Sequence, residues 1–315
     1  MAAGTGTTAE LAARAEPLFQ GRRQRTLWGD AFRQFRRHRM AMLGLIVFSF
    51  LVVATLIGPA IYPKPINDID LAQKLHGPSL SHPFGTDDLG QDILARVLFG
   101  GRVSIAVGLV AMLISVTIGT LLGALAGFFG GFTDVVIMRI TEVMLSLPQL
   151  PLLLLVIYLF RDKLRHAIGP ELGTFTMIVV IIGALAWMRV ARLVRASFLS
   201  IKEKEYIEAA RSVGVPSGRL MIVHMLPNAL SPVIVAASLG VAAAILTESA
   251  LSFLGLGFPP DLPTWGRILY DAKDRLDTAP YWAMAPGICI FLAILSINFI
   301  GDGLRDALDP RRTSQ

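Results

Sequence analysis

Two carboxylates and one amide stand in stretches of the sequence that hold few other polar side chains. Glu142 and Glu248 are the carboxylates, and Asn298 is the amide. An ionisable group at membrane depth is costly, so each is a candidate for a transport pathway or a polar contact between helices. Arg139 precedes Glu142 by three residues, the spacing of an ion pair on one helix. For Glu248, lining a wet pathway and a hydrogen bond to a neighbouring helix remain equal alternatives.

The sequence lacks the motifs of the common catalytic and nucleotide-binding sites. It contains no GxxxxGK[ST] phosphate loop, no HExxH zinc site and no GxSxG nucleophile turn. His224 has no partner at metal-ligand spacing. Cys289 is the one cysteine, so an intramolecular disulfide is impossible. We therefore expect a non-catalytic chain that binds no metal and no cofactor by itself.

The composition indicates a membrane protein. Of 315 residues, 54% are hydrophobic and 17% are charged, whereas soluble domains carry about 25% charged residues. The apolar runs are continuous and roughly 20 residues long, which favours helices that cross a bilayer over a β-barrel. We predict an all-α membrane protein with six transmembrane helices, the third kinked by Pro148 and Pro151. The predicted spans are 40–62, 103–128, 136–160, 175–194, 229–255 and 282–304.

The distribution of basic residues predicts the orientation. With both termini inside, the inner segments hold 19 of the 29 Lys and Arg residues, although Arg161, Lys163 and Arg165 oppose this arrangement. Basic loops also account for the net charge of +6 without nucleic acid. The chain is expected in the cell inner membrane. Its predicted parts are a cytoplasmic segment (1–39), a first transmembrane helix (40–62), an extracytoplasmic loop (63–102), a transmembrane domain (103–304) with a cytoplasmic elbow (203–220), and a cytoplasmic tail (305–315).

Two further patterns predict packing. Trp28, Phe32 and Phe35 recur at helical spacing beside a cluster of arginines, which is typical of an amphipathic helix on the inner leaflet. A disordered basic flank is the alternative. In the second span, glycines at 119, 123 and 127 form a GxxxGxxxG series, which lets another helix approach closely.

The connection from 189 to 228 is too long for a minimal turn and too polar to be inserted in the bilayer. Residues 203–213 are good helix formers and place Tyr206, Ala210 and Val213 on one stripe. Gly214 stands where a left-handed cap would end the helix, and Pro216 prevents its continuation. A helix–turn–helix elbow for a partner protein and a plain interfacial loop are both consistent with this pattern.

The elbow resembles the EAA signature of binding-protein-dependent ABC importer permeases. Glu208-Ala-Ala is followed after three residues by Gly214, and nine residues later by His224-Met-Leu-Pro227. His224 departs from the usual aliphatic residue but is similar to the peptide and nickel branch, where Asn228 also fits. Three other stretches resemble the second permease subunit of dipeptide and oligopeptide importers: 84–104, 248–266 and 298–310. In the first stretch, Gln91 stands where that family often has Arg.

The resemblance implies a type I ABC importer permease (MetI-like) fold. It also implies a sister permease subunit, two ATPase subunits that bind ATP and Mg, and an extracytoplasmic solute-binding protein. The elbow would dock in a cleft of the ATPase. The residues matched to this coupling role are Tyr206, Glu208, Ala209, Ala210, Gly214, Leu226 and Pro227.

The expected cargo is a di- or oligopeptide, with nickel, glutathione or another small peptide-like solute as the alternative. A secondary transporter driven by an ion gradient is a distant alternative. That class is typically built from two repeated halves with broken helices and ionisable groups at the midplane. This sequence has no such internal repeat and only scattered charges.

Overall fold

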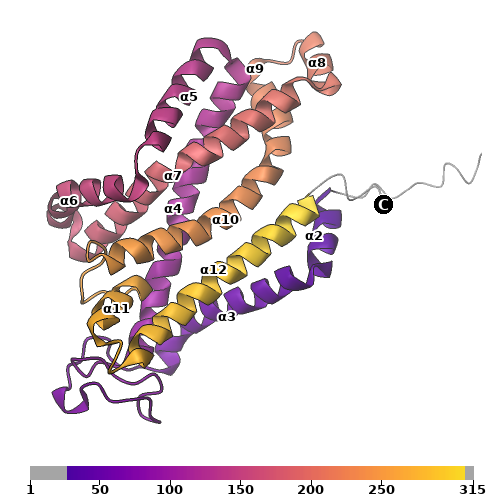
Figure 1. Cartoon of the computed structure of the whole chain (residues 1–315). Helices are drawn as coiled ribbons and strands as arrows, with labels where there is room; N and C mark the ends of the chain where they lie inside the picture. The colour runs from indigo at the N-terminus through magenta and orange to yellow at the C-terminus, as the bar shows by residue number, and fades with distance from the viewer. Residues whose placement is uncertain (1–26, 309–315) are drawn as a thin grey trace, which may run out of the picture.

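The computed structural model describes residues 27–308, so the parts of the predicted terminal segments at 1–26 and 309–315 lie outside the described residues. Between residues 27 and 308 the chain is helical and has one isolated β-bridge, between Thr86 and Asp92. The helices in Figure 1 are α2 (Leu27–Arg37), α3 (Arg39–Ile61), η2 (Leu71–Gln73), α4 (Ile93–Phe129), α5 (Gly131–Ser146), α6 (Gln149–Ile168), α7 (Pro170–Lys202), α8 (Glu205–Ser212), α9 (Ser217–Arg219), η3 (Leu220–Met225), α10 (Leu226–Phe253), α11 (Trp265–Ala272), η4 (Lys273–Arg275) and α12 (Pro280–Leu308).

Five helical segments are long and apolar enough to cross a membrane. They contain α3, α4, α7, α10 and α12, and the pair α5–α6 makes a sixth if it is counted as one span. The all-α transmembrane fold is therefore confirmed. The third span differs from the prediction, because 136–160 is not one kinked helix. α5 and α6 meet at an angle of 92°, and the break falls at Leu147 and Pro148.

Several predicted loops are helical in the structure. α4 begins at Ile93, so 93–102 belongs to the helix and not to the predicted extracytoplasmic loop. α7 continues through 189–202, which the prediction assigned to the polar connection. Residues 161–168 complete α6, and 305–308 complete α12. Charged residues do not end these two helices, because Arg102 and Lys202 donate hydrogen bonds to backbone carbonyls of neighbouring helices. Arg102 Nε lies 2.6 Å from the Thr55 oxygen, and Lys202 Nζ lies 3.0 Å from the Phe128 oxygen.

α4 and α7 approach each other closely along the predicted glycine series. A Cβ atom at Gly119 would lie 2.6 Å from Cβ of Val190, and one at Gly127 would lie 2.6 Å from Cβ of Phe198. At Gly123 the added atom would collide with the backbone oxygen of Ala191. Small residues at this spacing are what allow two helix backbones to touch in a membrane. The seam between α4 and α7 is thus built by the glycines.

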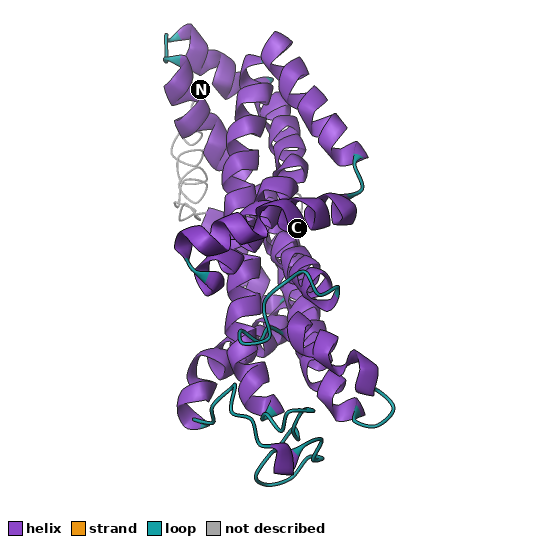
Figure 2. Cartoon of the chain, turned by 90° about the vertical axis from the view of Figure 1, so that its left-hand side faces the viewer, coloured by secondary structure: helices purple, strands orange, loops and turns teal. Residues whose placement is uncertain are grey.

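The two ends of the helix bundle differ in character (Figures 1 and 2). The short helices α8 and α9 lie at the end of the bundle where α4 ends at Phe129 and α7 ends at Lys202. α11 and the 62–92 loop lie at the opposite end. Most of the loop length gathers at this second end, which we call the loop end. The first end, with α8 and α9, is called the elbow end.

At the loop end, Asp92 gathers several donors at the start of α4. Its carboxylate accepts hydrogen bonds from the backbone N–H of Ala95 at 2.9 Å and from the Tyr62 hydroxyl at 2.7 Å. His82 Nδ1 and Lys64 Nζ lie 2.8 Å and 3.3 Å from it. Burial opposes ionisation of Asp92, but these donors outweigh it and hold the pKa of the carboxyl below its usual value. The 62–92 loop is thereby fastened to α4.

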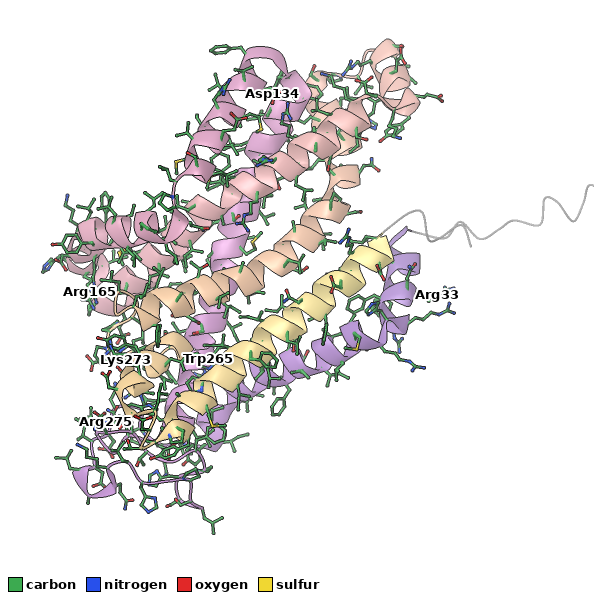
Figure 3. The ribbon with its side chains drawn as sticks, viewed as in Figure 1. Arg33, Asp134, Arg165, Trp265, Lys273 and Arg275 are labelled. Atoms are coloured by element: carbon green, nitrogen blue, oxygen red, sulfur yellow. The ribbon has the colours of Figure 1, made fainter. Side chains whose placement is uncertain are left out.

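Arg96 and Trp265 fasten α11 to the same end of α4. Arg96 bridges two acids, with Asp87 at 3.5 Å and Asp271 at 3.6 Å. Burial raises the pKa of both carboxyls, although the neighbouring arginines counteract it. Trp265, labelled in Figure 3, is buried and donates from its indole nitrogen to the Val97 oxygen at 3.0 Å.

Residues 27–37 form a helix, α2, and not a disordered flank, while the predicted place of this helix on the inner leaflet stays a prediction. The Trp28 side chain lies outside the described residues. Phe32 faces away from the protein and is 63% exposed. Phe35, however, packs against Gly303 of α12. Gln34 donates to the Asp306 backbone oxygen at 2.8 Å, so one face of α2 packs against α12.

We predict that Gly123→Ala opens the seam between α4 and α7. The added methyl meets backbone atoms, and overpacking of this kind typically costs about 1–3 kcal/mol. The melting temperature of the purified protein should fall. Gly287→Ala in α12 is the matched control, because a Cβ atom there meets nothing within 4 Å. Equal melting temperatures for the two variants would contradict the close contact.

Candidate functional site

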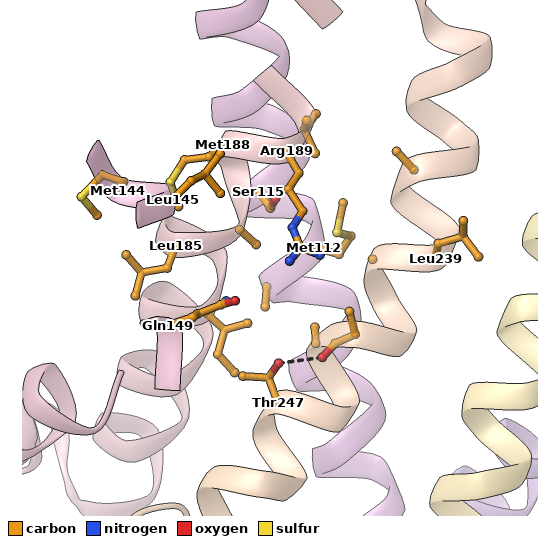
Figure 4. A pocket seen from close by; sticks show the side chains of 18 of the residues that line it. Met112, Ser115, Met144, Leu145, Gln149, Leu185, Met188, Arg189, Leu239 and Thr247 are labelled. Atoms are coloured by element: carbon orange, nitrogen blue, oxygen red, sulfur yellow. Dashed lines mark hydrogen bonds between the residues drawn. The ribbon is translucent and has the colours of Figure 1, made fainter. Parts of the chain in front are cut away.

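A cavity of about 450 Å³ lies at mid-depth of the bundle (Figure 4). Its walls come from α4, from both sides of the α5–α6 break, from α7 and from α10. Ala111, the middle residue of α4 (Ile93–Phe129), is one of the lining residues. Three methionines, Met112, Met144 and Met188, contribute to the mainly apolar wall. The cavity therefore lies far from both ends of the bundle.

Four polar residues line the cavity: Ser115, Gln149, Arg189 and Thr247. The Thr247 hydroxyl donates to the Ala243 oxygen at 2.8 Å within α10. Arg189 is the one charged member of the lining set, which contains no carboxylate among the described residues. Sequence reasoning missed it because Arg189 was counted with the polar connection from 189 to 228. The predicted fourth span ends at 194, whereas the helix continues to Lys202.

The predicted polar candidates Glu142 and Asn298 lie outside the cavity lining. Glu142 is exposed on α5 and pairs with Arg139 at 3.2 Å, which is the predicted i, i+3 ion pair. Asn298 is exposed on α12. The structure does not bring these two residues together with Arg189, and their role in transport stays a prediction.

Glu248 forms a hydrogen bond between helices. It is completely buried, and its carboxylate accepts from the Ser252 hydroxyl at 2.7 Å within α10 and from the Ser104 hydroxyl of α4 at 3.1 Å. The Ser104 oxygen also accepts the backbone N–H of Trp265 at 3.2 Å. Of the two alternatives for Glu248, the geometry favours the contact with a neighbouring helix, here at the junction of α4, α10 and α11.

The elbow ends its first helix as the sequence indicates. Gly214 has φ of +82°, the left-handed conformation that glycine adopts without strain. The N–H of Val215 donates to the Ala210 oxygen at 3.1 Å, and the N–H of Gly214 donates to the Arg211 oxygen at 2.9 Å. This pair of bonds is a Schellman motif. Pro216 then precedes α9, so the chain turns sharply between the two short helices.

The surface of the elbow is largely open. Tyr206 is 47% exposed and Val213 is 84% exposed, whereas Ile207 is completely buried. The packed face of α8 therefore contains Ile207, and the predicted stripe of Tyr206, Ala210 and Val213 faces mainly outward. The exposed members of the predicted coupling set are Tyr206, Glu208, Ala209, Gly214 and Pro227, while Ala210 and Leu226 are half-buried.

Ile207 attaches the elbow to the long helices. It packs in one apolar cluster with Phe128 at the end of α4, Phe198 of α7, and Leu220 and Met225 of η3. A π-helical turn, η3, joins α9 to α10, and Pro227 follows directly at the start of α10. The elbow therefore shares one apolar cluster with the elbow-end parts of α4, α7 and α10.

The loss of a backbone donor at Pro227 is accompanied by a side-chain bond. Asn228 Nδ2 donates to the His224 oxygen at 2.6 Å, inside the turn where the helical hydrogen bonds change spacing. Proline has no backbone N–H to donate. Asn228 thus adds a side-chain donor next to the residue that lacks a backbone donor.

The helices, the central cavity and the exposed elbow form the arrangement expected of the permease class that the sequence resembles. Residues 119–314 match the family described as binding-protein-dependent transport system inner membrane component. Residues 26–78 match the N-terminal TM domain of oligopeptide transport permease C. The chain belongs to the family of binding-protein-dependent transport system inner membrane components and is a multi-pass membrane permease.

The chain is similar over nearly its whole length to permease proteins of peptide transport systems. It is 37% identical to the dipeptide transport system permease protein of Alkalihalophilus pseudofirmus, over 91% of both chains. It is 42% identical to the oligopeptide transport system permease protein of Escherichia coli K12, over 91% of this chain and 92% of that one. The glutathione transport system permease protein of Escherichia coli O6:K15:H31 is 38% identical over 96% of both.

We predict that Glu248→Ala destabilises the protein and that Glu248→Gln is tolerated. The alanine variant leaves the buried hydroxyls of Ser104 and Ser252 without their acceptor, at a typical cost of about 1–3 kcal/mol for each unpaired group. The glutamine variant keeps one acceptor oxygen in place. Thermal unfolding of the purified protein measures both effects. A transport defect in a fully stable glutamine variant would show instead that Glu248 acts in the pathway.

Proposed function

We propose that this chain is one permease subunit of an ATP-driven importer of di- or oligopeptides. A sister permease would complete the pathway, two separate ATPase subunits would bind ATP and Mg, and an extracytoplasmic binding protein would deliver the solute. The observation that carries the proposal is the elbow. Its residues match the coupling signature, and they form a capped, exposed helix fixed to α4 and α7.

The exposed side chains of α8 suit docking in a cleft. Glu208 and Ala209 lie on its open face, where the small alanine permits close approach and the carboxylate offers a charged contact. Ile207 on the opposite face anchors the helix in the core. Closure of the ATPases would push the elbow sideways, and the shared core would pass this displacement to the cavity as a rigid-body movement.

The proposed orientation places the elbow end in the cytoplasm. The elbow shares this end with α2, the helix that carries the first basic cluster, and the positive-inside rule favours that side. The loop end, with the 62–92 loop and α11, would then face outward and contact the binding protein. The basic residues of α6 belong to the helix that bends across the bundle, so they give little information on sidedness.

The relatives support a peptide as cargo and leave glutathione as the second candidate. Two of them are named for dipeptide and oligopeptide transport, and a third is named for glutathione transport at similar identity. Glutathione is itself a small peptide, so the two candidates share the peptide bond and free carboxylates. Nickel remains the alternative inferred from the branch that the sequence resembles.

Peptide uptake by proteoliposomes that contain the whole complex tests the proposed function. Wild-type complex with its binding protein should accumulate a labelled tripeptide only when ATP is supplied to the ATPase side. Gly214→Val should reduce uptake at least about tenfold, because a β-branched residue does not fit φ of +82° and the elbow loses its shape. Glu208→Lys should uncouple ATP hydrolysis from uptake by reversing a charge.

Gly218→Ala is the matched control for the elbow. It lies in the same exposed segment, and a Cβ atom there meets nothing within 4 Å. Uptake should remain at the wild-type rate. Normal uptake and normal solute-stimulated ATPase activity in both Gly214→Val and Glu208→Lys would remove the elbow from the coupling mechanism.

Cysteine labelling tests the orientation. With Cys289→Ser as background, Leu80→Cys in the 62–92 loop and Ser217→Cys in the elbow place single thiols at opposite ends of the bundle. A membrane-impermeant maleimide should label Leu80→Cys in intact spheroplasts. It should label Ser217→Cys only after the membrane is permeabilised. The reverse pattern would invert the proposed topology.

A further inference from the structure

The charge of Arg189 has no counter-ion in the described part of the chain. No ion pair or hydrogen bond joins its guanidinium to another residue between 27 and 308. Arg195, two turns further along α7, differs in this respect, because Asp134 of α5 binds it with both carboxylate oxygens. Figure 3 labels Asp134 at the elbow end of α5. The arginine near the end of the helix is neutralised, and the arginine in the cavity is not.

Arg189 lies near the middle of α7 and is exposed on this chain, on the wall of the cavity. Thirteen residues separate it from the end of α7 at Lys202, which is about 20 Å of helix. Figure 4 shows its side chain extending between Ser115 and Met112 into the cavity. An unpaired charge at membrane depth persists where a wet pathway or an anion compensates it. The guanidinium of Arg189 is therefore available to an anion that enters the cavity.

Two other groups at the cavity have unused hydrogen-bonding capacity. Ser115 is completely buried, and its hydroxyl oxygen has no partner among the described residues. At the α5–α6 break, Gln149 lines the cavity as the first residue of α6. The backbone N–H of a first helical residue has no intrahelical acceptor, and Pro148 provides no side-chain cap. The N-terminal end of a helix carries partial positive charge and favours anions. These donors add to the charge of Arg189.

We infer that this cavity is a transit site for the terminal carboxylate of the transported peptide, with Arg189 as its principal ligand. The inference rests on the proposed function as a peptide importer. A guanidinium can bind both oxygens of a carboxylate, which every unmodified peptide carries whatever its sequence. Met112, Met144 and Met188 line the same cavity with flexible, polarizable side chains, which adapt to different peptide side chains. The site thus binds the terminal carboxylate of the peptide and accepts different side chains.

Uptake of trialanine and of trialanine amide by the reconstituted complex tests this site. The two peptides have the same side chains, and only the first has a terminal carboxylate. The ratio of their initial rates is compared between wild type and Arg189→Gln, so any preference of the binding protein cancels. Arg189→Gln should lower the ratio by about tenfold or more, as expected for a lost charged hydrogen bond. Arg189→Lys should retain part of the preference for trialanine, since lysine keeps the positive charge but cannot bind both carboxylate oxygens as a guanidinium does.

Arg192→Gln is the matched control. Arg192 is exposed on α7 like Arg189 but does not line the cavity, so the ratio should stay at the wild-type value. An unchanged ratio in Arg189→Gln would overturn the inference, including the case in which both uptake rates fall equally because Arg189 pairs with an acid of the sister permease. An equal drop of the ratio in Arg192→Gln would also overturn the inference, because it would show that the loss of any positive charge on this part of α7 lowers the ratio.

A binding measurement separates this inference from the proposed function. If the wild-type complex imports neither peptide, peptide import fails as its function. The thermal stability of the purified complex with millimolar trialanine then decides the site. Stabilisation by trialanine, none by its amide and none in Arg189→Gln would retain a carboxylate site for another solute. Absence of stabilisation in the wild type would remove the site as well.

Discussion

Membrane helices gain little by hiding apolar side chains from lipid, so they hold together where backbones touch and polar groups pair. In this permease the contact between α4 and α7 meets that requirement along three successive glycines. The seam runs from the cavity to the elbow end, where Ile207 and Phe198 share one apolar cluster. At the loop end, α4 also carries the Asp92 and Arg96 networks. One helix therefore links the loop end, the cavity and the elbow.

The second constraint is that backbone groups inside a bilayer need partners. An interrupted helix at membrane depth is tolerated where it is buried in protein or lines a wet cavity. The α5–α6 break satisfies this condition, because residues on both of its sides line the cavity. The break thus serves two purposes, since it shapes the wall and presents the start of α6 beside Arg189. A continuous third helix would have closed that wall with side chains.

Apolar run length and local turn chemistry were enough to predict the all-α fold, the glycine seam and the cap at Gly214. Those features depend on residues near one another in sequence. The ends of α4 and α7 and the place of Arg189 could not be predicted, because they depend on partners from other helices, such as the Phe128 carbonyl that receives Lys202. For the same reason Glu248 stayed ambiguous until Ser104, 144 residues away, was found beside it.

The packing of α3 against α12 has a consequence for biogenesis. A Cβ atom at Gly44 would lie 2.6 Å from the Ser296 oxygen, so the first transmembrane helix fits closely against the last one. These residues are 252 positions apart in the chain. At synthesis rates of about 5–20 residues per second, α3 waits on the order of tens of seconds in the bilayer before this partner emerges. The nascent permease must pass that interval with one face of its first helix covered by lipid, by the insertion machinery or by another subunit.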